Sequence, residues 1–169
     1  AAQAAVSAHI FKRAGGRGTV IYLPDASRGD GGPQERGVRA AHAAFREIDL
    51  VVASPSAAGS VADSLARSLV SEHPSVTAII AATDALALEA THAFTALCLG
   101  PTPLVAGFGA SAEALLALQH GRLSATVSLD LCELTQRALE TTLNAVSRRP
   151  AARATTFTLV TPDNVQEAA

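Results

Sequence analysis

The sequence predicts an α/β protein built on a doubly wound parallel sheet. Short runs of β-branched and apolar residues alternate along the chain with helical patterns of about 10 to 15 residues, which is typical of βαβ units with right-handed crossovers. The 169 residues are enough for one domain with a hydrophobic core and too few for two comfortable ones. With 49% hydrophobic and 17% charged residues, the composition is that of an ordinary globular protein.

The first half of the chain contains three predicted strands, and a helix precedes each of them. Apolar residues at helical spacing are followed by Gly15 and Gly16, which end the first helix. The run TVIYL comes next and is typical of a buried parallel strand. The predicted elements are a helix over 3–12, a strand over 19–23, a turn-rich loop over 24–33, a helix over 34–45, a strand over 49–54, a helix over about 61–71 and a strand over 76–81.

The second half continues the alternation and then changes its rhythm. The elements predicted there are a helix from about 85 to 97, a strand over 103–108, a short helix over 111–121, a strand over 123–129, a long helix over 131–149 and a last strand over 155–160. Gly100 and Pro101 break the first of these helices, and Gly121 closes the second.

Charge and cysteine content argue against several classes of function. The net charge is −2 and the basic residues are scattered, so we expect no direct contact with nucleic acid. Cys98 and Cys132 match no metal or redox spacing and are expected to be small buried hydrophobes. No apolar run reaches the roughly 20 residues of a membrane span, and no signal peptide opens the chain.

No motif for a cofactor, a metal or a catalytic nucleophile is found. The five histidines show no pair at metal-binding spacing, and neither a Gly-rich phosphate loop nor a GxSxG elbow occurs. We therefore expect no cofactor, no metal and no catalytic residue. An enzyme on a flavodoxin-like fold is the least favoured class of function. Because methionine is absent even at position 1, the chain is expected to be processed or a fragment.

Several motifs occur in the order and spacing of a known family. They are GGRGTVIYL, QERGVRAAHAAF, AATDALALEA and VAGFGASAEALLALQHGRLSATVSLD. Together they resemble the second half of type I periplasmic binding proteins and of the related ligand-binding domains of LacI-type repressors. FTLVTPDNV near the end is more similar to the transport proteins than to the repressors.

The resemblance implies how the chain is divided between two lobes. Residues 1–108 correspond to the C-terminal lobe, 109–148 to elements that cross into the other lobe, and 149–169 to a return strand and tail. The N-terminal lobe would then be missing. In that arrangement the helices at 112–118 and 131–146 carry apolar faces meant for an absent sheet, and such a surface marks an interface. We therefore expect the chain to pair with another polypeptide or to form a homodimer.

Two segments near the first strand supply candidate ligand-binding residues. The resemblance places Arg36 at the position of the family's sugar-binding arginine, whose guanidinium fork suits neighbouring hydroxyls or a carboxylate. The alternative for Arg36 is a surface ion pair with Glu35 or Asp30. Asp25 and Ser27 leave the carboxyl end of a strand and would face the ligand, whereas a plain solvent-exposed loop is the alternative.

Two further junctions complete the candidate site. Thr83 and Asp84 stand where the family has an Asn-Asp pair, so the resemblance implies a ligand-binding role for both, with the single hydroxyl of Thr83 in the place of the ligand-contacting amide. Either of them is also able to cap the helix that begins at Ala85, a role worth about 1 kcal/mol, which we favour for Asp84. Phe108 matches an aromatic residue that packs against a sugar ring, and a place in the core is its alternative.

Three positions depart from the family's pattern, and the first is Thr83, which lacks the family's amide. Gly109 stands where the family has a sugar-binding aspartate, and Leu129 where a polar side chain often contacts the ligand. Each missing partner leaves a buried ligand hydroxyl unpaired, at a cost of roughly 1–3 kcal/mol. A typical free pentose or hexose is therefore doubtful, and a less polar ligand, an acidic one or a lapsed site is the alternative.

The resemblance implies a small-solute, sugar-like binding module of an ABC-type uptake system, which acts by lobe closure rather than by chemistry. Its partners would be a small-molecule ligand, the N-terminal lobe and a membrane transporter, and its location periplasmic or extracytoplasmic. The alternative is the effector-binding domain of a LacI-type transcriptional regulator, which would be cytoplasmic.

Overall fold

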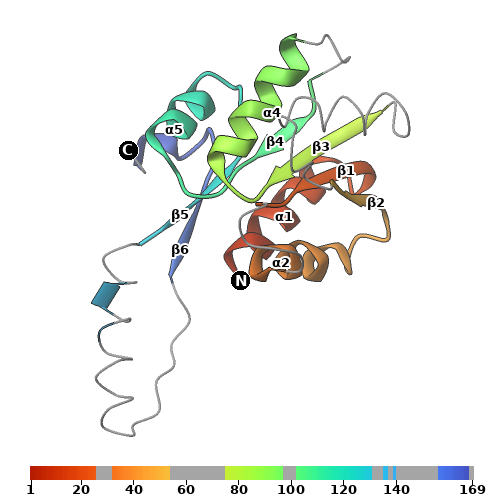
Figure 1. Cartoon of the computed structure of the whole chain (residues 1–169), viewed down its shortest axis with the longest axis horizontal. Helices are drawn as coiled ribbons and strands as arrows, with labels where there is room; N and C mark the ends of the chain where they lie inside the picture. The colour runs from red at the N-terminus through yellow and green to blue at the C-terminus, as the bar shows by residue number, and fades with distance from the viewer. Residues whose placement is uncertain are drawn as a thin grey trace, which may run out of the picture.

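The computed structural model describes residues 1–25, 32–53, 75–96, 102–130 and 156–167, together with Thr135, Gln136 and Leu139. Its elements are α1 (Ala2–Arg13), β1 (Arg17–Leu23), α2 (Pro33–His42), β2 (Glu47–Val52), β3 (Val76–Ala81), α4 (Asp84–Ala96), β4 (Leu104–Ala106), α5 (Ala112–Gln119), β5 (Thr126–Leu129), β6 (Phe157–Val160) and the 3-10 helix η2 (Val165–Glu167) (Figure 1). The predicted helix over 61–71 lies outside the described residues, as does all but three residues of the one over 131–149.

Four strands form the parallel sheet that the sequence predicts. Their order is β2-β1-β3-β4, and every neighbouring pair is parallel. The antiparallel pair β5-β6 continues this sheet, because Gly107 N–H donates to the Ala125 carbonyl at 3.0 Å and Gly109 N–H to that of Val127 at 2.9 Å. The connection that follows β1 leads to β2 on one side of it, whereas the connection that follows β3 leads away to β4 on the other side. The topological switch point therefore lies between β1 and β3.

Helices cover both faces of the sheet, and successive residues of each strand face opposite layers (Figure 1). In β1, Ile21 packs in the layer of α4 and α5, while its neighbours Val20 and Tyr22 pack in the layer of α1 and α2. The side chains of Val20 and Ile21 are completely buried. This double burial explains why the strands are continuous apolar runs rather than alternating patterns.

The second helix and second strand differ from their predicted bounds. α2 ends at His42 rather than at 45, and β2 begins at Glu47 rather than at 49. A turn replaces the last predicted turn of helix, with Ile48 N–H donating to the Phe45 carbonyl. The ring of Phe45 packs edge-on against Phe11, with ring centroids 5.4 Å apart. Phe45 therefore lies in a turn after the helix, where its ring packs against Phe11.

The expectation that α5 carries an apolar face for an absent sheet is wrong. Ala114, Ala117 and Leu118 are completely buried, in the same core cluster as Ile79 and Phe94. The face of α5 is thus used within this body, against α4 and the sheet. The packing of α5 therefore gives no reason to expect a dimer through this helix. The other helix of the expected surface, over 131–146, lies outside the described residues apart from three positions.

No helix among the described residues combines the length and apolar character needed to cross a membrane.

Candidate functional site

The ends of three parallel strands meet at the carboxyl edge of the sheet. Backbone bonds continue past the strands there: Ala82 N–H donates to the Leu23 carbonyl at 2.9 Å, and Asp84 N–H to the Phe108 carbonyl at 3.1 Å. The segments that follow β1, β3 and β4 are therefore held side by side at the switch point. This is the place where open α/β sheets bind ligands.

Thr83, not Asp84, caps α4. The Thr83 hydroxyl accepts a hydrogen bond from Leu86 N–H at 3.3 Å, and its carbonyl accepts from Ala87 N–H at 3.1 Å. The favoured capping role of Asp84 is therefore wrong. Thr83 itself is half-buried at the carboxyl edge of the sheet.

The carboxylate of Asp84 is directed inward, away from solvent. The residue is 4% exposed. Its Oδ2 accepts from Ser111 N–H at 2.7 Å, and its Oδ1 accepts from the Thr126 hydroxyl at 2.6 Å. Both oxygens thus have protein partners from segments far along the chain.

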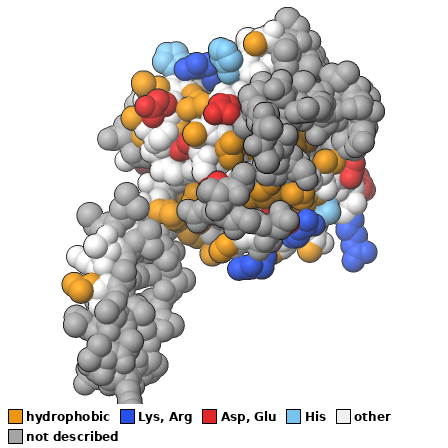
Figure 2. Space-filling view, viewed as in Figure 1, with side chains coloured by type: hydrophobic (Ala, Val, Ile, Leu, Met, Phe, Trp, Pro, Cys, Tyr) orange, Lys and Arg blue, Asp and Glu red, His pale blue; other side chains and the backbone are white. Residues whose placement is uncertain are grey.

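Phe108 is half-buried and packs against the core layer of α1 and α2, together with Leu129 and Phe157. The core alternative for its ring therefore has support from packing, while part of the residue stays accessible. Figure 2 shows hydrophobic side chains close to the point where the β5-β6 ribbon leaves the rest of the molecule.

The start of α2 supplies a contact that sequence reasoning missed. The Gln34 side chain donates through Nε2 to the Ala82 carbonyl at 2.8 Å, which ties α2 to the end of β3. Arg36 is exposed in the first turn of this helix. Glu35, one of its expected partners, forms an ion pair with Arg39 at 2.8 Å. Only the position of Gln34 in a loop-to-helix junction hinted at its role.

Asp25 is half-buried directly after β1, and Ser27 lies outside the described residues. Tyr22, one residue before the end of β1, is 2% exposed. Burial, followed by the negative charges of Glu35 and Asp25, raises the pKa of Tyr22 to about 12. Burial is therefore the main reason that the Tyr22 phenol keeps its proton, and the two nearby negative charges add to it.

Tyr22 is the single tyrosine of a chain without tryptophan, so its ionisation is directly measurable. We expect phenolate absorbance to appear with a midpoint near pH 12 in the folded protein and near the ordinary value of about 10 in denaturant. Because the folded state holds this proton more tightly, stability should fall between pH 10 and 12. Tyr22→Phe should abolish that fall. A folded-state midpoint near 10 would contradict the placement of Tyr22.

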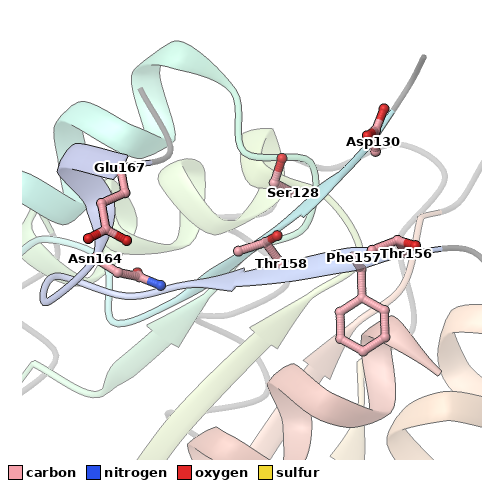
Figure 3. A pocket seen from close by; sticks show the side chains of 7 residues that line it. All are labelled: Ser128, Asp130, Thr156, Phe157, Thr158, Asn164 and Glu167. Atoms are coloured by element: carbon pink, nitrogen blue, oxygen red, sulfur yellow. The ribbon is translucent and has the colours of Figure 1, made fainter. Parts of the chain in front are cut away.

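A polar hollow of about 400 Å³, also not anticipated from the sequence, lies on the β5-β6 ribbon beside η2. Its lining residues are Ser128, Asp130, Thr156, Phe157, Thr158, Asn164 and Glu167 (Figure 3). In Figure 3 the Phe157 ring points away from the side chains of Ser128 and Thr158. Strand alternation places the side chains of Leu129 and Phe157 on the face of the ribbon opposite those of Ser128 and Thr158.

The described residues contain no group of three or more His, Cys, Asp or Glu side chains arranged to hold a metal ion. Polar side chains and the half-buried Phe108 follow the strands at this carboxyl edge. Such an arrangement suits recognition of a small polar molecule.

No sequence-family model matches the chain, and no curated protein matches it in sequence. Its fold does match solved structures. An ABC transporter periplasmic solute-binding protein from Actinobacillus succinogenes 130z with bound D-allose matches with a TM-score of 0.78 at 20% identity, over 98% of this chain and 60% of that one.

Two proteins from Geobacillus stearothermophilus match similarly. GanP, a glucose-galactose binding protein, has a TM-score of 0.76 at 18% identity, over 96% of this chain and 60% of its own. AraP, an arabinose binding protein, has a TM-score of 0.75 at 16% identity, over 98% and 61%. The expected resemblance is thus confirmed at the level of the fold: the chain matches one lobe of periplasmic sugar-binding proteins and spans 60–61% of these three chains.

Proposed function

We propose that this chain is part of a small-solute, sugar-like binding protein of an ABC-type uptake system, which acts outside the cytoplasm by lobe closure and without catalysis. One observation carries the proposal. The segments after β1, β3 and β4 converge at the β1/β3 switch point of a fold otherwise seen in sugar-binding transport proteins. The similarity to an ABC transporter periplasmic solute-binding protein favours transport over the regulatory alternative.

The proposed binding surface consists of Asp25, Thr83, Phe108 and Arg36. Arg36 is exposed at the start of α2, and Thr83 keeps part of its surface at the same edge. Leu129 packs among apolar side chains, and Gly109 offers no side chain, so neither supplies a polar contact. Free pentoses and hexoses are therefore expected to bind only weakly here, because some of their hydroxyl groups stay unpaired.

The proposal includes a second lobe that closes over this edge, with a membrane transporter as the partner of the whole. The division of the chain between lobes stays a prediction. Because α5 packs in the body described here, we place the start of the crossing segment at β5 rather than at 109.

The test is a heteronuclear NMR titration of the 17.2 kDa chain with D-allose, arabinose and glucose, which detects binding as weak as millimolar. We expect amide shifts at Asp25, Thr83 and Phe108, and none at Gly15 or Gly16 at the opposite edge of the sheet. The absence of shifts with all three sugars, or shifts confined to the opposite edge, would contradict the proposal.

Two arginines of α2 provide a matched pair of variants for the same titration. Arg36→Ala should weaken the binding of a sugar that shifts the wild-type spectrum. Arg39→Ala should leave binding unchanged, because Arg39 lies one turn further from the edge and pairs with Glu35. Equal losses in both variants would argue against a specific role for Arg36.

A further inference from the structure

We infer that Asp84 is a positioning residue: its carboxylate holds the corner formed by residues 107–111 in one backbone conformation and makes no contact with ligand. The corner includes Phe108, which is part of the proposed binding surface. Its importance for binding therefore rests on the proposed function. The conformation of the corner itself is measurable without any ligand.

Three hydrogen bonds connect Asp84 to its surroundings. Its backbone N–H donates to the Phe108 carbonyl at 3.1 Å, and its Oδ2 accepts from Ser111 N–H at 2.7 Å. Its Oδ1 accepts from the Thr126 hydroxyl at 2.6 Å. One residue therefore fixes the two ends of the corner and ties them to β5.

The corner closes tightly around this carboxylate. A Cβ atom on Gly107 would collide with Asp84 Oδ1, and one on Gly109 would lie 3.3 Å from Oδ2. Gly109 has a φ of +134°, and the next residue, Ala110, has a φ of 51°. A left-handed alanine is unfavourable by itself, so surrounding contacts must hold it. Ala110 N–H also donates to the Thr126 hydroxyl, at 3.4 Å.

Because Asp84 is buried, it can hold the corner in place but cannot contact a ligand. Asp84 is 4% exposed, and each carboxylate oxygen already accepts a hydrogen bond from the protein, so the carboxylate presents almost no surface to a solute at the edge. The hydroxyl of Thr126 is shared between Asp84 and Ala110, which makes this threonine the second member of the same arrangement.

The decisive variants are Asp84→Asn and Thr126→Val, with Thr126→Ser as the conservative rescue. Thr91→Val is the matched control, because the Thr91 hydroxyl is also buried but donates to the Ala87 carbonyl of its own helix. In ligand-free spectra, an amide proton bonded to a buried carboxylate resonates far downfield. We expect the Ser111 amide to move upfield in Asp84→Asn. The Gly109 and Ala110 amides should move in Thr126→Val and return in Thr126→Ser.

Sugar titrations of the same variants then separate this inference from the proposed function. If a sugar binds the wild-type chain, Asp84→Asn and Thr126→Val should both weaken binding, on the order of tenfold, while Thr126→Ser and Thr91→Val retain it. If no sugar binds, the proposed function fails while the ligand-free shifts still decide the positioning role. The inference is overturned if the corner resonances stay unchanged in Asp84→Asn and Thr126→Val, or if only Asp84→Asn weakens binding.

Discussion

Leu118→Ala is expected to lower the free energy of unfolding by about 2–5 kcal/mol, the usual cost of removing a fully buried leucine side chain. Leu118 is 0% exposed and lies in the core cluster that α5 shares with α4 and the sheet. The truncation would leave a cavity between these elements, because close-packed neighbours relax only in part. Urea denaturation followed by circular dichroism measures the loss.

Leu116 is the matched control for this experiment, since it lies on the same helix and is 52% exposed. Leu116→Ala makes the same chemical change and should alter stability by less than about 0.5 kcal/mol. Similar small effects of both substitutions would show that the apolar face of α5 is not packed in this body. Such a result would restore the expectation that α5 serves another lobe.

Gly107→Ala is expected to destabilise the protein by about 1–3 kcal/mol or more through overpacking. The added Cβ would collide with Asp84 Oδ1 and would lie 3.0 Å from the Cα of Asp84 and 3.3 Å from the Cβ of Ala87. Asp84 cannot move aside without losing its bonds to Ser111 and Thr126. Each kcal/mol corresponds to a fall in Tm of roughly 2–4 °C, which scanning calorimetry resolves.

Gly32→Ala serves as the control, because a Cβ there meets no atom within 4 Å. Its effect should be small, since Gly32 precedes α2 with an ordinary negative φ of −55°. If Gly107→Ala were as stable as Gly32→Ala, Gly107 and Asp84 would be packed less closely than in the structure. The positioning role of Asp84 would then lose its steric basis.

Much of the architecture was predictable because each element has its own local signature. The strand over 76–81 was predicted with its observed bounds, since β-branched and apolar residues run there without interruption. The predicted helix over 3–12 is observed as α1 with one residue more at each end. The end of α2 was not predictable, because the ring of Phe11, distant in sequence, draws Phe45 into a turn.

The candidate site was predictable in place but not in detail. Residues that follow strands were expected at one edge of the sheet, and Asp25, Thr83 and Phe108 lie after β1, β3 and β4. The cap of α4 was assigned to Asp84 instead of Thr83, because a strand-to-helix junction predicts a cap without saying which polar residue supplies it. Gln34 was missed altogether, since its acceptor on Ala82 is 48 residues away.

Apart from the short 3-10 helix η2, the sequence by itself determined the types and order of the elements observed in the described residues, and with them the parallel α/β sheet. Periodicity and turn residues suffice for this because they act over short distances along the chain. Only the tertiary structure decided which face of α5 is buried and what Asp84 binds. The partners of Asp84 lie 27 and 42 residues further along the chain. No local pattern specifies such contacts, because they form only when the sheet brings β3, β4 and β5 together.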